Sequence, residues 1–341
     1  GTPVVHISLR RDGAKNKSLI CCRFMLSARA VGWGLTVVSV AGAMSSLSGS
    51  TCAGCRGLGL HRLGAVPGRD PNRTNDMLLL PPQIQDHSSA SKHVVFFHGD
   101  IQNFHEEMAL HSDAAPWVGW SLEQAGRVLG RRFPDSHIWV VRASRMYLHK
   151  FSCYQHFVQC NMFGAPEHSG YEAGQGAFCQ LRSLLSNAMT RANLPHPLPP
   201  PEGSDTTIPP GFSLTLVGFS KGCVVLNQLV YELPGAQSDP LMSEFVQRIS
   251  DMFWLDGGHP GGSETWVTNK AVLKELASSG ISVHAHVTPY EVCDPMRAWV
   301  GREHEVFVKT LEEFGACPSK KLHFEDEPPS IENHFRVIQE F

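Results

Sequence analysis

Residues 212–233 read FSLTLVGFSKGCVVLNQLVYEL, and the segment GFSKG at 218–222 joins an apolar run to a helical pattern. The run at 212–217 is typical of a buried strand, and residues 223–233 have helical spacing. A chain that turns from strand to helix within about four residues strains the serine backbone and leaves little room at both glycines. The stretch therefore predicts a nucleophile elbow that presents Ser220 at the carboxyl edge of a sheet. The plainer alternative is an ordinary strand–helix turn with a surface serine.

Strand and helix patterns alternate on both sides of this elbow. Strands are predicted at 93–98, 137–142, 212–217, 252–255, 281–287 and 321–324, and helices at 121–131, 176–194, 223–233, 272–278 and 302–314. Such alternation gives a mostly parallel sheet with helices on both faces. The predicted fold class is an α/β-hydrolase-like three-layer sandwich. The stretch 145–172 is aromatic-rich and irregular, and it can either wall a substrate pocket or fill the core.

A serine needs a base within hydrogen-bond reach and a group that orients the base. In α/β-hydrolases these follow in the order Ser, acid, His, and the acid normally comes after the second strand beyond the elbow. That position favours Asp294, with Glu291 a weaker choice and Asp256, one strand earlier, the main alternative. His334 follows the last strand and is the predicted base. An Asp-Pro helix cap is the non-catalytic explanation of Asp294.

Two backbone N–H donors are needed for an oxyanion hole. One is predicted from Lys221, which follows the serine, and the other from Gly99 or Asp100, after the first buried strand. A simple Gly-Asp turn is the alternative for the second donor. The Lys221 side chain opposes the dipole at a helix start, so either an anionic substrate group docks there or the side chain points to solvent.

Composition and charge bound the class of protein. The chain has 341 residues, of which 42% are hydrophobic and 18% charged, so disordered, collagen and coiled-coil classes are excluded. The formal net charge of −3 hides an asymmetry. Residues 1–69 carry nine Lys/Arg and one acid, a charge of +8, whereas residues 70–341 carry 20 basic and 31 acidic groups, a charge of −11. A basic segment attached to a mildly acidic body indicates a targeting segment, and it argues against a nucleic-acid-binding domain.

Residues 1–65 are rich in Ser, Gly, Ala and Arg, which is typical of a mitochondrial transit peptide. A secretory signal around the apolar stretch 30–44 is an alternative, and a membrane anchor is less favoured because this stretch is too short to span a bilayer. We expect a targeting or disordered leader at 1–65 and a single domain at 66–341. The connection at 195–210 holds seven prolines and is expected to be stiff.

No cofactor or metal is expected. The chain has no Walker A motif, and no G-x-G-x-x-G stands between a strand and a helix. His284 and His286 alternate on one strand without clustered acids, and Cys52-Ala-Gly-Cys55 is a lone pair of cysteines, so both are weak metal candidates. The expected partners are a small acyl-type substrate and, if the fold acts as a scaffold, another protein.

Several segments resemble one particular family. They are FGAPEH at 163–168, LVGFSKGCVVLNQL at 216–229, WLDGGHPGGSETWVT at 254–268, HVTPY at 286–290, DPMRAW at 294–299 and SIENHFRV at 330–337. With these, most of residues 66–341 resembles the family of chromosome 2 open reading frame 69. The resemblance implies a mitochondrial protein, expected in the matrix, with an α/β-hydrolase-like fold and a link to respiratory-chain and energy homeostasis. It brings no catalytic assignment for Ser220, Asp294 or His334.

Two functions follow from these observations. The first is a serine hydrolase that cleaves an ester, thioester or amide with a Ser-Asp-His triad. The second is a non-catalytic scaffold or binding module that keeps the elbow for structural reasons.

Overall fold

The computed structural model describes residues 59–84, 91–161, 164–201 and 207–341, which all belong to one unit, Cys52–Phe341. Residues 1–58, and with them most of the expected leader, lie outside the described residues. The first strand, β1 (His61–Pro67), starts before residue 66, so the folded part begins a few residues earlier than the expected boundary.

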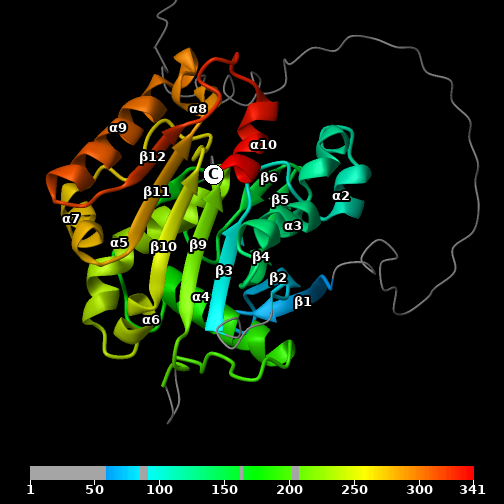
Figure 1. Cartoon of the computed structure of the whole chain (residues 1–341), viewed down its shortest axis with the longest axis vertical. Coiled ribbons are helices and arrows are strands. Elements are labelled where there is room, and N and C mark those ends of the chain that lie inside the picture. The colour runs from blue at the N-terminus through cyan, green and yellow to red at the C-terminus, as the bar shows by residue number, and fades with distance from the viewer. Residues whose placement is uncertain (1–58, 85–90, 162–163, 202–206) are drawn as a thin grey trace, which may run out of the picture. The chain divides into compact units, whose positions relative to one another are not determined.

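An eight-stranded sheet forms the centre of the molecule, in the order β1-β2-β4-β3-β9-β10-β11-β12 (Figure 1). The further strands are β2 (Thr74–Leu80), β3 (Lys92–Phe97), β4 (His137–Val141), β9 (Ser213–Phe219), β10 (Ile249–Leu255), β11 (Ser282–Val287) and β12 (Ser319–Leu322). β2 is antiparallel to both β1 and β4, whereas all neighbours from β4 to β12 pair in parallel.

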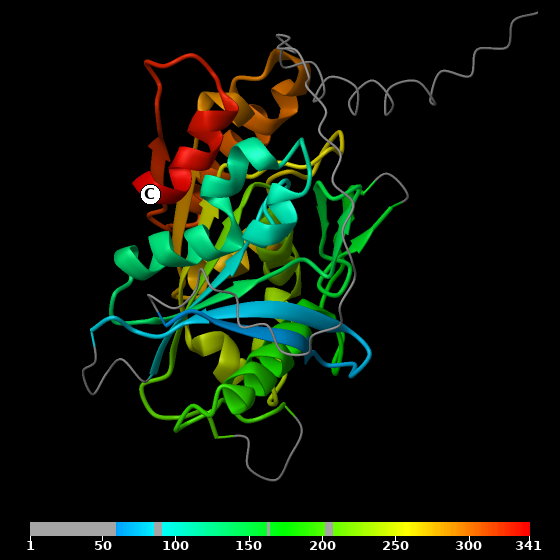
Figure 2. The ribbon, with the colours of Figure 1, turned by 90° about the vertical axis from the view of Figure 1, so that its right-hand side faces the viewer.

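Helices cover both faces of this sheet, as Figures 1 and 2 show from two sides. One hydrophobic core packs the sheet against α4 (Gly176–Arg191), α5 (Cys223–Ser238), α6 (Ser243–Gln247), α7 (Lys270–Ser278) and α9 (Ala298–Glu313). A second core packs the opposite face against α3 (Leu122–Arg132) and α10 (Ile331–Glu340). The fold is therefore the predicted α/β-hydrolase-like three-layer sandwich.

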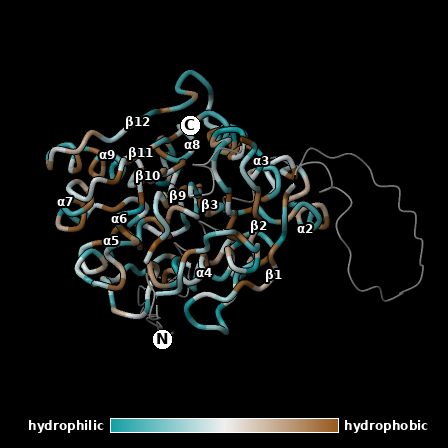
Figure 3. Tube along the Cα trace, turned by 60° about the horizontal axis from the view of Figure 1, so that its bottom comes forward, coloured by the Kyte–Doolittle hydropathy of each residue, from teal (hydrophilic) through white to brown (hydrophobic). Residues whose placement is uncertain are grey.

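The period of two along the strands divides the buried side chains between these cores. On β3, Val95 and Phe97 belong to the first core, and Val94 and Phe96 to the second. A strand buried on both faces is a continuous apolar run in sequence, which explains why the central strands were predictable. In Figure 3 brown hydrophobic stretches recur along the strands and their flanking helices.

The two antiparallel strands were not predicted from sequence. β1 is mostly exposed, with only Val66 fully buried, so its sequence HRLGAVP carries no apolar period. The stretch 145–172 also differs from the expectation of an irregular segment. It contains two small hairpins, β5 (Arg145–Tyr147) with β6 (Phe151–Cys153), and β7 (Gln159–Cys160) with β8 (Pro166–Glu167).

The remaining helical segments are short. They are α2 (His105–Ala109), η3 (Ala115–Trp120), η4 (Ser220–Gly222), α8 (Pro289–Val292) and η5 (Pro295–Arg297). Within the described ranges, the helices lack the combination of length and apolar character that crossing a membrane requires.

A buried carboxylate joins α4 to α5. Glu232 on α5 is 1% exposed, and its two oxygens accept hydrogen bonds from the backbone N–H groups of Ala177 (2.7 Å) and Phe178 (3.0 Å) in the first turn of α4. Gln228 donates a third bond at 2.8 Å. Burial raises the pKa of Glu232, and these donors counter that shift because they favour the ionised form. The carboxylate replaces the N-cap side chain that α4 lacks.

We expect Glu232→Ala to lower the free energy of unfolding by about 2–4 kcal/mol, because it leaves two buried N–H donors without an acceptor. Urea denaturation measures the change. Glu305→Ala is the control, since Glu305 forms only an exposed pair with Lys309 and its loss should cost less than about 1 kcal/mol. Equal effects of the two substitutions would contradict the capping role.

Candidate active site

Ser220 lies at the strand–helix turn with a backbone φ of +52°, in the left-handed region that non-glycine residues rarely adopt. The turn is closed by its two glycines. A Cβ on Gly222 would overlap the carbonyl of Phe97, and one on Gly218 would lie 3.0 Å from the Cα of Cys223. Ser220 is 8% exposed and begins η4, which runs directly into α5. The local geometry is that of a nucleophile elbow.

The loop after β3 packs directly against this turn. A Cβ on Gly99 would lie 2.7 Å from the Cβ of Ser220, so only glycine permits the observed approach. The Gly99 N–H donates to Gln102 Oε1 at 3.0 Å and is therefore occupied. The described hydrogen bonds leave the N–H of Asp100 without an acceptor. Of the two candidates after β3, only Asp100 therefore has an N–H free to bind an oxyanion, and the N–H of Lys221 lies in the first helical turn, where backbone N–H groups lack intrahelical acceptors.

His98 fixes the shape of this loop. Its Nε2 accepts the Ala143 N–H at 2.9 Å, so Nδ1 carries the proton and donates to the Gly99 carbonyl at 2.7 Å. Burial lowers the pKa of His98 to about 3, which keeps the ring neutral and this tautomer constant at physiological pH. Tyr154 adds a 2.8 Å bond from its hydroxyl to the His98 carbonyl.

The imidazole of His334, on α10, lies against the carboxylate of Asp256, which directly follows β10. His334 Nδ1 is 2.7 Å from Asp256 Oδ2. The carboxylate is fully buried and also accepts the backbone N–H of Thr288 at 2.7 Å and its hydroxyl at 2.6 Å. This arrangement directs His334 Nε2 away from the acid, as a general base requires.

The structure does not bring Asp294, the first choice from sequence, to His334. Asp294 caps η5 by accepting the Met296 N–H at 2.8 Å, and it pairs with Arg297 at 2.8 Å. The Asp-Pro pair thus ends in the helix cap that was its non-catalytic explanation. Counting strands gave Asp294 because the acid usually follows the strand that is β11 here. In this chain the acid that contacts His334 is the alternative, Asp256, which follows the preceding strand, β10.

Glu291, the weaker choice, is buried near the pair without contacting it by a hydrogen bond. It forms a 2.8 Å ion pair with Arg297. Its carboxyl packs so closely against Gly258 that a Cβ added to that glycine would lie only 2.6 Å from the carboxyl atoms. Burial raises the pKa of Glu291 to about 7, and Arg297 opposes that rise.

Ser220 and His334 are neighbours through Phe219, whose ring centroid is 4.7 Å from that of His334. The hydrogen bonds of the described residues include none between Ser220 Oγ and His334 Nε2. Such bonds are often long in unliganded enzymes and tighten when substrate binds. The three side chains come from the ends of β9 and β10 and from α10, so the parallel sheet gathers them at its carboxyl edge.

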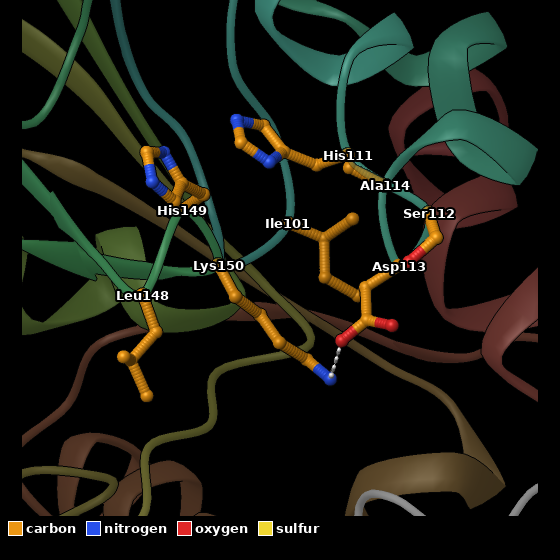
Figure 4. A pocket seen from close by; sticks show the side chains of 8 residues that line it. All are labelled: Ile101, His111, Ser112, Asp113, Ala114, Leu148, His149 and Lys150. Atoms are coloured by element: carbon orange, nitrogen blue, oxygen red, sulfur yellow. Dashed lines mark hydrogen bonds and ion pairs between the residues drawn. The ribbon is translucent and has the colours of Figure 1, made fainter. Parts of the chain in front are cut away.

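A surface pocket of about 170 Å³ lies beside the loop that follows β3 (Figure 4). It is lined by Ile101, His111, Ser112, Asp113, Ala114, Leu148, His149 and Lys150. The two imidazoles stack at 3.9 Å, and Lys150 lies 3.5 Å from Asp113. The Ile101 N–H donates to the Lys150 carbonyl at 2.7 Å. Because Ile101 directly follows Asp100, this bond connects the Lys150 side of the pocket to the loop after β3.

In the part of the chain that the structure describes, no group of three or more His, Cys, Asp or Glu side chains is arranged to hold a metal ion. His284 binds Asp251 at 2.9 Å, and His286 Nδ1 binds His323 Nε2 at 2.8 Å, so these two histidines act in separate pairs. Gln102 and Thr288, which hold the oxyanion loop and the acid, were missed from sequence. The available signal was that Thr288 directly follows the strand predicted at 281–287, while Gln102 lies four residues after the one predicted at 93–98.

The fold is that of an α/β-hydrolase, with the elbow serine at the carboxyl edge of the sheet. The chain belongs to the C2orf69 family, whose model matches residues 62–202 and 201–317. It is 60% identical over 332 residues to a Danio rerio protein named mitochondrial protein C2orf69 homolog, covering 93% of this chain and 96% of that protein. It is 44% identical over 333 residues to the Homo sapiens mitochondrial protein C2orf69, covering 82% and 86%.

Among solved structures, the chain is similar to a thermostable esterase, with a TM-score of 0.39 and 14% identity over 80% of this chain. It spans 56% of that esterase. A brefeldin A esterase gives a TM-score of 0.38 and 11% identity, covering 85% of this chain and 75% of that one.

We expect Gly222→Ala to destabilise the protein by about 1–3 kcal/mol or more, because the added methyl group overlaps the backbone carbonyl of Phe97, which cannot move aside cheaply. Gly262→Ala is the control, since nothing lies within 4 Å of a Cβ built there. Thermal unfolding of both variants measures the difference. A Gly222→Ala protein as stable as the control would contradict the close packing of the elbow.

Proposed function

We propose that the protein is a serine hydrolase that cleaves an ester, thioester or amide, with Ser220 as nucleophile, His334 as base and Asp256 as the orienting acid. The observation that carries the proposal is the buried Asp256–His334 hydrogen bond of 2.7 Å beside an elbow serine with strained backbone. A buried acid held by three hydrogen bonds next to an imidazole is an arrangement that catalysis by a triad requires.

The proposed reaction proceeds in two halves. Ser220 Oγ attacks the carbonyl carbon while its proton passes to His334 Nε2, and His334 then protonates the leaving atom as the bond to it breaks. Water then attacks the acyl carbonyl carbon while its proton passes to His334, and His334 gives that proton to Ser220 Oγ as the acyl–oxygen bond breaks. Asp256 stabilises the imidazolium that forms in each half, and its bonds to Thr288 hold the carboxylate in place.

The negative charge on the carbonyl oxygen would be met by the backbone N–H groups of Asp100 and Lys221. Each such donor typically contributes about 2.7–4 kcal/mol to transition-state stabilisation. The neutral His98 and the Gln102 acceptor support this assignment, because they fix the Gly99–Asp100 peptide before substrate arrives.

We place this activity in mitochondria and, within them, in the matrix. Relatives in Danio rerio and Homo sapiens carry mitochondrial protein in their names, and the basic, acid-poor residues 1–65 have transit-peptide composition. The resemblance to the family adds a role in respiratory-chain and energy homeostasis to the proposal.

A non-catalytic scaffold is the second candidate. It is favoured by one observation, namely that no described hydrogen bond joins Ser220 to His334. A scaffold would keep the elbow for packing alone, and it would bind a protein partner as well with alanine at position 220 as with serine.

A fluorophosphonate probe should label the wild-type protein, and Ser220→Ala should abolish the labelling. Loss of a working triad serine costs on the order of 10⁶-fold in kcat. The control is Ser278→Ala, at the exposed end of α7, which should label like wild type. Folded wild-type protein that stays unlabelled, together with rescue of mitochondrial function by Ser220→Ala, would favour the scaffold.

The identity of the acid is tested by two isosteric changes. Asp256→Asn should lower kcat by on the order of 10⁴-fold, because the amide supports the wrong histidine tautomer. Asp294→Asn keeps an oxygen that can cap η5 and should lower kcat less than about tenfold. Ester hydrolysis under saturating substrate measures both. A larger loss in Asp294→Asn would reverse the assignment.

A further inference from the structure

Lys221 is a buried cation beside the proposed nucleophile. Lys221 is only 4% exposed, and its Nζ donates to the carbonyl of Gly164 at 2.6 Å. Within the described ranges, no carboxylate lies within 4.0 Å of this ammonium. An ammonium has three N–H donors, and a buried charge without an opposite charge is costly. The expectation that the side chain points to solvent is therefore wrong.

Asp100 is the acid on which the charge of Lys221 acts. Its Oδ1 accepts both the backbone N–H and the hydroxyl of Ser152, at 2.8 and 2.9 Å, so the carboxyl is held on the β6 side. Burial raises the pKa of Asp100, and the charge of Lys221 only partly opposes this. Asp100 thus forms no ion pair with Lys221 and leaves its ammonium available to another anion.

His259 supplies a second buried donor. Its Nδ1 accepts the Gly261 N–H at 3.0 Å, so Nε2 carries the proton of the neutral ring. That Nε2 is buried, in a residue 3% exposed, and has no partner at full hydrogen-bond geometry, although the Glu264 backbone lies close enough to act on the pKa of His259. Burial lowers the pKa of His259 to about 3, and the charge of Lys221 acts in the same direction. A buried N–H donor without a well-placed acceptor can still take a ligand oxygen as its hydrogen-bond partner.

The two donors lie around one short stretch of chain. Gly164 accepts from Lys221, and the next residue, Ala165, has its Cβ 2.8 Å from where a Cβ on Gly261 would be. The same Cβ would lie 2.7 Å from Cε1 of His259, the ring atom next to Nε2. The loop that carries His259 also touches the nucleophile, since the Gly258 N–H donates to the Ser220 carbonyl at 3.3 Å.

We propose that Lys221 Nζ and His259 Nε2 bind a carboxylate on the acyl part of the substrate, so that the protein prefers acyl groups that end in a carboxylate over neutral ones. The inference rests on the proposed hydrolase function and names its substrate class. The acyl side is chosen because the backbone of Lys221 is assigned to the carbonyl oxygen, whereas the leaving atom must face His334. A carboxylate supplies acceptors for both donors and the negative charge that the ammonium lacks.

The test compares two esters of equal chain length, 4-nitrophenyl hydrogen glutarate and 4-nitrophenyl valerate. Wild type should give a kcat/KM at least tenfold higher for the glutarate. Lys221→Met and His259→Phe should each reduce that ratio about tenfold, and Lys221→Arg should keep it within about threefold because it retains the charge. A wild-type ratio near or below one, or a ratio unchanged in Lys221→Met, would overturn the inference while hydrolysis of either ester upholds the hydrolase.

A binding measurement separates this inference from catalysis. Millimolar glutarate should raise the Tm of the Ser220→Ala protein, because a ligand that binds only the folded state stabilises it. The rise should disappear in Ser220→Ala/Lys221→Met, and 1,5-pentanediol with sodium chloride of matched ionic strength should give none. If neither ester turns over and the probe labels nothing, the hydrolase proposal fails by itself. If the protein does hydrolyse an ester but glutarate does not raise the Tm of Ser220→Ala, the result counts against the anion site alone.

Discussion

The contact between the backbone of Gly222 and the carbonyl of Phe97 holds the two loops of the site together. It packs the turn after β9 against the end of β3. Gly99, in the loop after β3, packs in turn against the Cβ of Ser220. Because both contacts involve main chain and Cβ atoms, no side-chain rotation can relieve them. The positions of Ser220 and of the N–H groups of Asp100 and Lys221 relative to one another follow from this packing, and the parallel sheet sets the distance between the two strands.

The polar residues around this junction divide into two kinds. His98, Gln102, Thr288 and Glu232 have their hydrogen bonds satisfied, and they hold backbone and carboxylate groups in fixed positions. Lys221 and His259 are buried with donor capacity that the described residues satisfy only in part. Satisfied buried groups contribute to stability, whereas unsatisfied ones cost free energy, so the second kind is where ligand binding would recover that cost.

The carboxylate that contacts His334 follows β10 and not β11, and the two strands are direct neighbours in the sheet. Leu255 on β10 pairs with His286 on β11, so the residues that follow these two strands reach the same edge of the sheet. Thr288 after β11 then serves the carboxylate after β10 through its N–H and hydroxyl. A separate ion-pair network follows β11. In it Arg297 pairs with both Glu291 and Asp294, so neither of these carboxylates is left without an opposite charge.

The sequence by itself determined the central strands, the elbow at Ser220, the basic composition of residues 1–65 and His334 as the histidine after the last strand, because these depend on local periodicity, glycine spacing and chain order. It did not determine β1, which is mostly exposed and lacks an apolar period, or the choice among Asp256, Glu291 and Asp294. Only the tertiary structure shows which of the three reaches His334, since that depends on how the segments after β10 and β11 pack and not on local pattern. The burial of Lys221 was likewise a matter of tertiary structure. Its Nζ donates a hydrogen bond to the carbonyl of Gly164, between β7 and β8 and 57 residues away in the sequence.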